Sequence, residues 1–185
     1  MIHHGVEREF FEVGRQRQPG DFLLCVSTLH PHKNLERLIR ASMDGLPRLV
    51  ITGLRGFEAE RLEQFAGPGV QFTGWIPREQ LYELFRTARG FVYPSTFEGF
   101  GMPVLEAMAA GVPVACSDIP PLREIADGCV SFFDPLDEAS MRDGMLQLLN
   151  PSQLTQAAQA RAAEFTWEKT ARATLQYLTQ IAHLK

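Results

Sequence analysis

The chain has 185 residues, of which 45% are hydrophobic and 22% charged, so it can bury one good core. Its net charge of −4 gives no support for nucleic-acid binding, which usually shows a basic stripe, and no apolar run is long enough to span a bilayer. Three cysteines are an odd number and do not suggest a disulfide framework, so we expect a reducing, cytoplasmic location.

Strand-like and helix-like segments alternate along most of the chain, which is typical of βαβ units and a parallel sheet. Strands are expected at 22–27, 48–53 and 70–73 and near Phe91, Val114 and Val130. Helices are expected from about Asn34, at 57–65, after Pro77, at 102–110 and at 121–126. The predicted fold class is therefore α/β, a single doubly wound Rossmann-like domain with about six parallel strands.

The pattern is helical from Asp137 to the end of the chain. Asn150-Pro151 breaks one helix, and Thr166 is a candidate N-cap for the last helix. That helix carries an apolar stripe made of Trp167, Ala171, Leu175, Leu178 and Ile181.

Residues 94–110 combine several features of a ligand site. An apolar run ending at Tyr93 leads into a glycine-containing loop, and a helix then opens with Pro103 near its first position. A loop that feeds a helix N-terminus presents unpaired N–H groups and the positive end of a dipole, which suits phosphate. Two carboxylates frame the segment, Glu98 in the loop and Glu106 in the helix. Their spacing lets one reach distal hydroxyls of a ligand while the other reaches a group nearer the helix.

Lys33 lies in the loop that joins the first strand to its helix, just before Asn34, which is a good N-cap residue. Ligands of open α/β sheets lie at the carboxyl ends of the strands, so this loop faces a cleft. A lysine there supplies a point charge for a diphosphate. Taken alone, a solvated surface lysine is the simpler interpretation.

Two other readings of the sequence are weak. Gly99-x-Gly101 matches a dinucleotide fingerprint poorly, because Val104 replaces the third small residue and the motif follows the fourth strand. The pairs His3-His4 and His30-x-His32 lack partner ligands at metal spacing.

The region around Glu98 and Glu106 resembles a known signature. Seven residues separate the two carboxylates, with Gly-Phe-Gly and Pro between them and Ala-Met-Ala-Ala-Gly-Val-Pro-Val after Glu106. This pattern is similar to that of the retaining nucleotide-sugar glycosyltransferases of family 4, or group 1, which have the GT-B fold. The resemblance runs from about Ile2 to Ala171, and in that family this stretch is the C-terminal, donor-binding half of the enzyme.

The resemblance implies a division of the chain into a linker segment at 1–20, a Rossmann-like nucleotide-sugar-binding domain at 21–150 and C-terminal helices at 151–185. In the family these last helices return to an N-terminal, acceptor-binding domain. The chain enters in the middle of the family pattern, so we expect the natural protein to continue before Met1.

The resemblance also implies roles for the residues of the central motif. Lys33 and Glu98 would be catalytic, with Lys33 on the diphosphate and Glu98 on the donor sugar. Glu106 would accept hydrogen bonds from the ribose hydroxyls. The amides of Gly99, Phe100, Gly101 and Met102 would hold the phosphates.

Other donor-binding positions are implied less directly. Thr28 and His32 occupy the places where the family often has an arginine, so one phosphate contact is weaker or is supplied by His32. Gly53 would lie on the cleft side, although plain turn chemistry also explains it. The backbone around Ile76 would hold the nucleobase, and Leu81 packs either near the base or in the core.

The implied function is transfer of a hexose from a nucleoside diphosphate sugar to an acceptor hydroxyl, in bacterial polysaccharide or glycolipid synthesis. GDP-mannose is slightly favoured over a UDP-hexose as donor.

No cofactor and no metal are expected, because the chain contains no Asp-x-Asp for a metal–diphosphate site. The expected partners are the nucleotide sugar and the N-terminal domain, with peripheral association of the full-length enzyme at the cytoplasmic face of the inner membrane. We expect the 185 residues alone to be inactive. The alternative is a stand-alone nucleotide-binding module.

Overall fold

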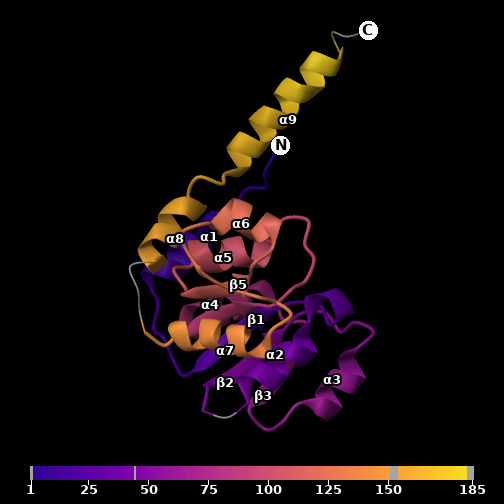
Figure 1. Ribbon diagram of the computed structural model, residues 1–185. Coiled ribbons are helices and arrows are strands. Elements are labelled where there is room, and N and C mark those ends of the chain that lie inside the picture. Colours follow the sequence, from indigo (N-terminus) through magenta and orange to yellow (C-terminus); the bar gives the residue numbers. More distant parts are fainter. Residues whose placement is uncertain (1, 44, 151–153, 183–185) are drawn as a thin grey trace.

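The computed structural model describes residues 2–43, 45–150 and 154–182, and these form a six-stranded sheet covered by helices on both faces (Figure 1). All strand pairs are parallel, in the order β3-β2-β1-β4-β5-β6. This order is the Rossmann-type arrangement, so the predicted fold class is confirmed. The strands are β1 (Phe22–Val26), β2 (Arg48–Thr52), β3 (Val70–Gly74), β4 (Gly90–Tyr93), β5 (Val114–Ser117) and β6 (Ser131–Phe133).

The helices follow the strands in the expected alternation. They are α1 (Arg8–Arg15), the 3₁₀ turn η1 (Pro31–Lys33), α2 (Leu35–Ser42), α3 (Ala59–Phe65), α4 (Arg78–Thr87), α5 (Met102–Ala109), α6 (Pro120–Ala126), α7 (Glu138–Gln147), α8 (Leu154–Ala162) and α9 (Trp167–Ala182). The predicted break at Asn150-Pro151 involves residues 151–153, which lie outside the described residues. Thr166 caps α9 as predicted, because its Oγ1 accepts a hydrogen bond from the N–H of Lys169 at 3.2 Å.

Each face of the sheet has its own core, because successive side chains of a strand point to opposite faces. Leu24 belongs to the core under α1, α4, α5, α6 and α8, whereas Leu23 and Cys25 belong to the core under α2, α3 and α7. Figure 1 shows these two helical layers on either side of the sheet. The strands read as continuous apolar runs because both of their faces are covered.

Helix α1 lies inside the segment 1–20, where no helix is predicted from the sequence. Phe10 of this helix is fully buried and meets the ring of Phe85 edge-on, with ring centroids 5.3 Å apart. Val6, Phe10 and Val13 have the i, i+4, i+7 spacing of one helical face, so the signal was present in the sequence. This segment is therefore part of the core of the domain.

Helix α9 buries none of its residues and extends away from the body of the domain (Figure 1). Leu175 is 67% exposed and Leu178 is 58% exposed, so the predicted apolar stripe faces solvent. Within the described residues, no helix combines the length and apolar character that crossing a membrane requires.

We expect the backbone amides of α9 to exchange with solvent much faster than those of β1 and β4. Local opening is easy where few apolar contacts are lost, and α9 buries no side chain, whereas Leu24 and Phe91 of the sheet are fully buried. Hydrogen exchange followed by mass spectrometry on a dilute, monomeric sample measures this difference. Equal protection of α9 and the two strands would contradict the prediction.

Candidate functional site

An open cleft of about 590 Å³ lies at the carboxyl edge of the sheet, where β1 and β4 end side by side. The strand order reverses at this point, and crevices of this kind hold ligands in open α/β sheets. The cleft is lined by several predicted residues, namely Thr28, Lys33, Gly53, Glu98, Gly99, Phe100, Gly101 and Met102. The topology thus gathers residues from the loops after β1, β2 and β4.

Lys33 and Glu98 form an ion pair in this cleft. Lys33 Nζ donates to Glu98 Oε1 at 2.6 Å and to the Tyr93 hydroxyl at 3.1 Å. Both charged side chains are largely enclosed, with 14% of Lys33 and 11% of Glu98 exposed. The Tyr93 hydroxyl is un-ionised, because burial raises its pKa far above the usual range, with the nearby Glu98 charge acting in the same direction. The lysine charge is therefore compensated before any ligand arrives.

The loop from Gly99 to Met102 ends at the N-terminus of α5 and has free backbone donors. Among the described residues, no acceptor is found for the N–H groups of Gly99, Phe100, Gly101 and Met102. These N–H groups and the dipole of α5 give this side of the cleft a positive potential. Gly101 has φ 102°, and a Cβ there would lie 2.4 Å from Leu122 Cδ2, so the tight entry into α5 requires glycine.

Gly53 lies where β2 ends beside β1. Its φ is 139°, and a Cβ at this position would lie 2.2 Å from the carbonyl oxygen of Ser27. A side chain would therefore force the two strand ends apart. Gly53 lines the cleft, and the close approach of the two strand ends requires a glycine at this position.

Glu106 lies one turn beyond Met102 on the same face of α5 but does not itself line the cleft. Its carboxylate accepts no hydrogen bond from the described residues, and the charges that act on it belong to Arg78 and Glu7. Arg78 is ion-paired to Glu7 and also bonded to the hydroxyl of Tyr82 at 3.2 Å. Burial raises the pKa of Glu106 to about 7, with Arg78 lowering it and Glu7 raising it.

The remaining predicted residues, His32, Ile76 and Leu81, do not line the cleft. His32 is exposed in η1, and its ring stacks on that of His30 with centroids 6.0 Å apart. Ile76 is half-buried in the loop between β3 and α4. Leu81 of α4 packs against the core, in agreement with the second of its two interpretations.

The cleft residues that sequence reasoning missed include Tyr93 and His4. Tyr93 is buried at the end of β4 and receives the second hydrogen bond of Lys33. His4 also lines the cleft and meets the ring of Phe100 edge-on, with ring centroids 5.2 Å apart. In the sequence, His4 stands out only as part of the pair His3-His4, which lacks partner ligands at metal spacing. In the described part of the chain, no three His, Cys, Asp or Glu side chains are placed to share a metal ion.

The fold and the cleft define a doubly wound α/β domain with a ligand-sized crevice at its switch point. Residues 6–165 match the family described as glycosyl transferases group 1. The chain therefore belongs to this family of glycosyltransferases, and the family resemblance of its central motif is confirmed.

Curated relatives include an O-antigen chain mannosyltransferase B of Escherichia coli, 36% identical over 169 residues, and a D-inositol 3-phosphate glycosyltransferase of Frankia alni, 32% identical over 208 residues. The matches cover 83% and 95% of this chain but 44% and 51% of the relatives, so the chain spans about half their length.

Solved structures with a similar fold include sucrose-phosphate synthase from Thermosynechococcus elongatus, with a TM-score of 0.79 and 23% identity. The match covers 99% of this chain and 50% of that protein. A second is Anabaena HepE in complex with UDP and glucose, with a TM-score of 0.81 and 18% identity, covering 97% and 56% of the two chains.

We predict that Glu106→Gln stabilises the protein at pH 8 but not at pH 4. The unfolded carboxyl ionises near 4.5 and the folded one near 7, so the unchanged protein loses stability as pH rises between these values. The glutamine removes this loss of stability, which is on the order of 3 kcal/mol at pH 8. Urea unfolding at several pH values measures it. The control is Glu79→Gln at an exposed position of α4, which should leave the pH dependence unchanged. A stability difference for Glu106→Gln that is the same at pH 4 and pH 8 would contradict the assignment.

Proposed function

We propose that this chain is the donor-binding half of a retaining glycosyltransferase that moves a hexose from a nucleoside diphosphate sugar to an acceptor hydroxyl. The observation that carries the proposal is the Lys33–Glu98 pair lying beside the free N–H groups at the start of α5. A cation and several N–H donors on one side of a cleft suit a diphosphate, and a carboxylate beside them suits sugar hydroxyls.

The proposed reaction depends on stabilising a leaving group. Cleavage of the sugar–phosphate bond leaves negative charge on the β-phosphate, and Lys33 together with the amides from Gly99 to Met102 would stabilise that charge. Glu98 would orient the sugar by accepting hydrogen bonds from its hydroxyls. The leaving phosphate would accept the proton of the acceptor hydroxyl on the same face of the sugar, so this half needs no base of its own.

Glu106 is assigned to the ribose in this proposal. A half-buried carboxylate without a hydrogen-bond partner is costly, and ribose hydroxyls are donors that relieve the cost. Glu106 lies one turn beyond Met102, so it would be close to the proposed phosphate site, where the nucleoside would begin.

We infer GDP-mannose as the preferred donor and a bacterial polysaccharide as the product. Support comes from the relatives named as O-antigen chain mannosyltransferases, whereas the similar fold seen with UDP and glucose keeps a UDP-hexose as the competing donor.

Transfer would also require the acceptor-binding half, so residues 1–185 alone should bind donor without transferring sugar. The cytoplasmic location, peripheral at the inner membrane, belongs to the same proposal. The second candidate, a stand-alone nucleotide-binding module, makes the same binding predictions.

Calorimetric titration with UDP, GDP, ADP and their sugar conjugates tests the proposal. We expect at least one nucleoside diphosphate, with GDP favoured, to bind in the presence of EDTA, because Lys33 and the N–H groups supply the positive charge. If the nucleoside diphosphate binds only when magnesium is present, the proposal of a metal-free site is wrong. Failure of every nucleoside diphosphate to bind would overturn the function.

Lys33→Ala and Glu98→Gln should change diphosphate affinity in opposite directions. Losing the lysine removes a charged hydrogen bond and should cost roughly 1.5–3 kcal/mol for the diphosphate, with little effect on the free nucleoside. Losing the carboxylate removes the group that competes with the phosphate for Lys33, so the free diphosphate should bind more tightly while the advantage of the sugar conjugate shrinks.

The control for this pair is Lys169→Ala, at an exposed lysine of α9. It should leave both affinities unchanged. If Glu98→Gln weakens the free diphosphate as much as Lys33→Ala does, the two side chains are not competing partners.

A further inference from the structure

The residues on both sides of Lys33 are hydrogen-bonded to the loop that carries Glu98. On one side, the carbonyl oxygen of His32 accepts from the N–H of Thr96 at 2.8 Å. On the other, Asn34 Nδ2 donates to the carbonyl oxygen of Pro94 at 3.0 Å. The loop after β1 and the loop after β4 are thus joined at two points that flank the Lys33–Glu98 pair.

Both Nδ2 hydrogens of Asn34 are used in long-range contacts, and its Oδ1 accepts one bond from the neighbouring helix α2. Its second Nδ2 hydrogen goes to the carbonyl oxygen of Pro135 at 2.7 Å, and its Oδ1 accepts from Arg37 at 2.6 Å. The predicted capping role is therefore wrong: Asn34 occupies the N-cap position of α2, but its side chain makes no capping hydrogen bond. Its backbone has φ 57°, the only left-handed conformation of a non-glycine residue in the described parts of the chain.

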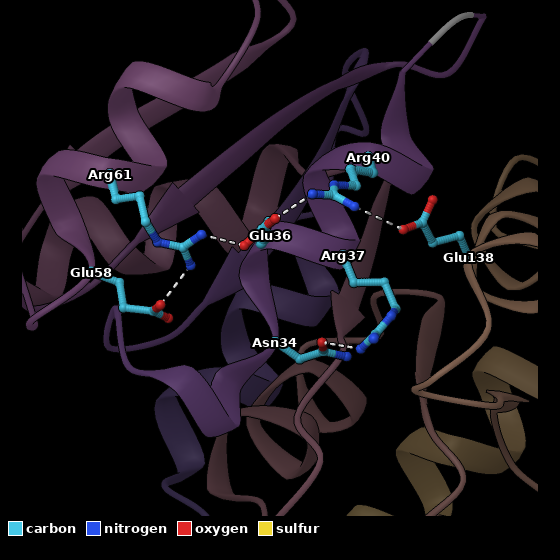
Figure 2. Close-up of polar contacts among 7 residues, drawn as sticks. All are labelled: Asn34, Glu36, Arg37, Arg40, Glu58, Arg61 and Glu138. Carbon is cyan, nitrogen blue, oxygen red and sulfur yellow. Dashed lines mark hydrogen bonds and ion pairs between the residues drawn. The ribbon is translucent and has the colours of Figure 1, made fainter.

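Arg37 supports Asn34 from the next turn of α2 (Figure 2). It also donates to the carbonyl oxygen of Pro135 at 3.2 Å and forms no ion pair with a carboxylate among the described residues. Arg40 and Arg61, by contrast, are both ion-paired to Glu36 in the same region (Figure 2). These three arginines line a small hollow of about 220 Å³. The charges of Arg40 and Arg61 are paired with Glu36, whereas Arg37 is hydrogen-bonded to Asn34 and Pro135.

We propose that Asn34, held by Arg37, is a positioning residue that sets the place of Lys33 opposite Glu98. A lysine side chain is flexible, so its ammonium group is directed to a phosphate only if its backbone is fixed. The amide of Asn34 fixes that backbone to the two neighbouring loops, and the left-handed conformation sets the direction in which the chain enters α2. The expected effect of Asn34 on diphosphate binding rests on the proposed function, whereas its effect on Lys33 in the free protein does not.

The free protein is tested by competitive acetylation with acetic anhydride, read by mass spectrometry. The chain has three lysines, and exposed Lys169 serves as the internal reference for Lys33. Asn34→Gly retains the left-handed backbone and removes only the side chain. We expect it to raise the acetylation rate of Lys33 relative to Lys169 roughly three- to ten-fold, as for loss of one buried hydrogen bond.

Arg37→Gln should raise the same ratio, and Arg40→Gln is the matched control on the same helix, which should leave it unchanged. Arg37→Gln keeps the inference testable if Asn34→Gly does not fold. Equal acetylation ratios in the unchanged protein and in the folded Asn34→Gly and Arg37→Gln variants would overturn the inference.

Measurements of diphosphate affinity distinguish a positioning role of Asn34 from a general loss of stability. In the unchanged background, Asn34→Gly should weaken the nucleoside diphosphate found by calorimetry about ten-fold. In the Lys33→Ala background it should add less than about two-fold, because the group that it positions is gone.

Equal losses in both backgrounds would show that Asn34 does not act through Lys33. If no nucleoside diphosphate binds the unchanged protein, the proposed function fails while the acetylation experiment still decides the role of Asn34.

Discussion

The parallel pairing of β1 with β4 is the constraint on which the site depends. The register pairs Leu23 with Gly90 and Leu24 with Phe91, and the two strands then end together at the carboxyl edge. A Cβ on Gly90 would lie 2.8 Å from the side chain of Leu148, so glycine is required for this pairing to fit under α7. From the common edge, the chain after β1 turns to α2 on one face and the chain after β4 turns to α5 on the other. The crevice between the two diverging loops is the cleft.

The cleft holds opposite charges in a partly enclosed environment. An ion pair with little solvent access gains more from Coulomb attraction than an exposed pair does, but each charge also loses hydration. The 2.6 Å contact between Lys33 and Glu98 satisfies both groups in the absence of ligand. A diphosphate would give the lysine a second anionic partner, and sugar hydroxyls would give the carboxylate new donors. The proposed donor would therefore exchange the contact between the two side chains for contacts with the ligand, and each charged group would keep a hydrogen-bond partner.

The strands of the sheet were predictable from the sequence because each is marked by residues within or next to its own segment. Strands covered on both faces read as apolar runs, and the glycines and Pro103 around α5 mark the loop and the helix start. The same local reasoning failed at Asn34, where capping preference predicted a contact within α2. Its Nδ2 donates instead to the carbonyl oxygens of Pro94 and Pro135, which lie 60 and 101 residues away along the chain. The burial of Tyr93 beside Lys33 and the charges around Glu106 likewise arise from packing between distant segments, which residue spacing does not encode.

Helix α1 was missed for a different reason, since Val6, Phe10 and Val13 have helical spacing but the family resemblance assigned them to a linker.

A crystal structure of the chain with a bound nucleoside diphosphate tests the central claim most directly. We expect the β-phosphate to lie within hydrogen-bonding distance of Lys33 Nζ and of the N–H groups between Gly99 and Met102. We also expect the ribose hydroxyls to face Glu106 and Asn34 to keep its contacts with Pro94 and Pro135. A diphosphate bound elsewhere, for example against the arginines of α2, with the contact between Lys33 and Glu98 unchanged, would contradict the account.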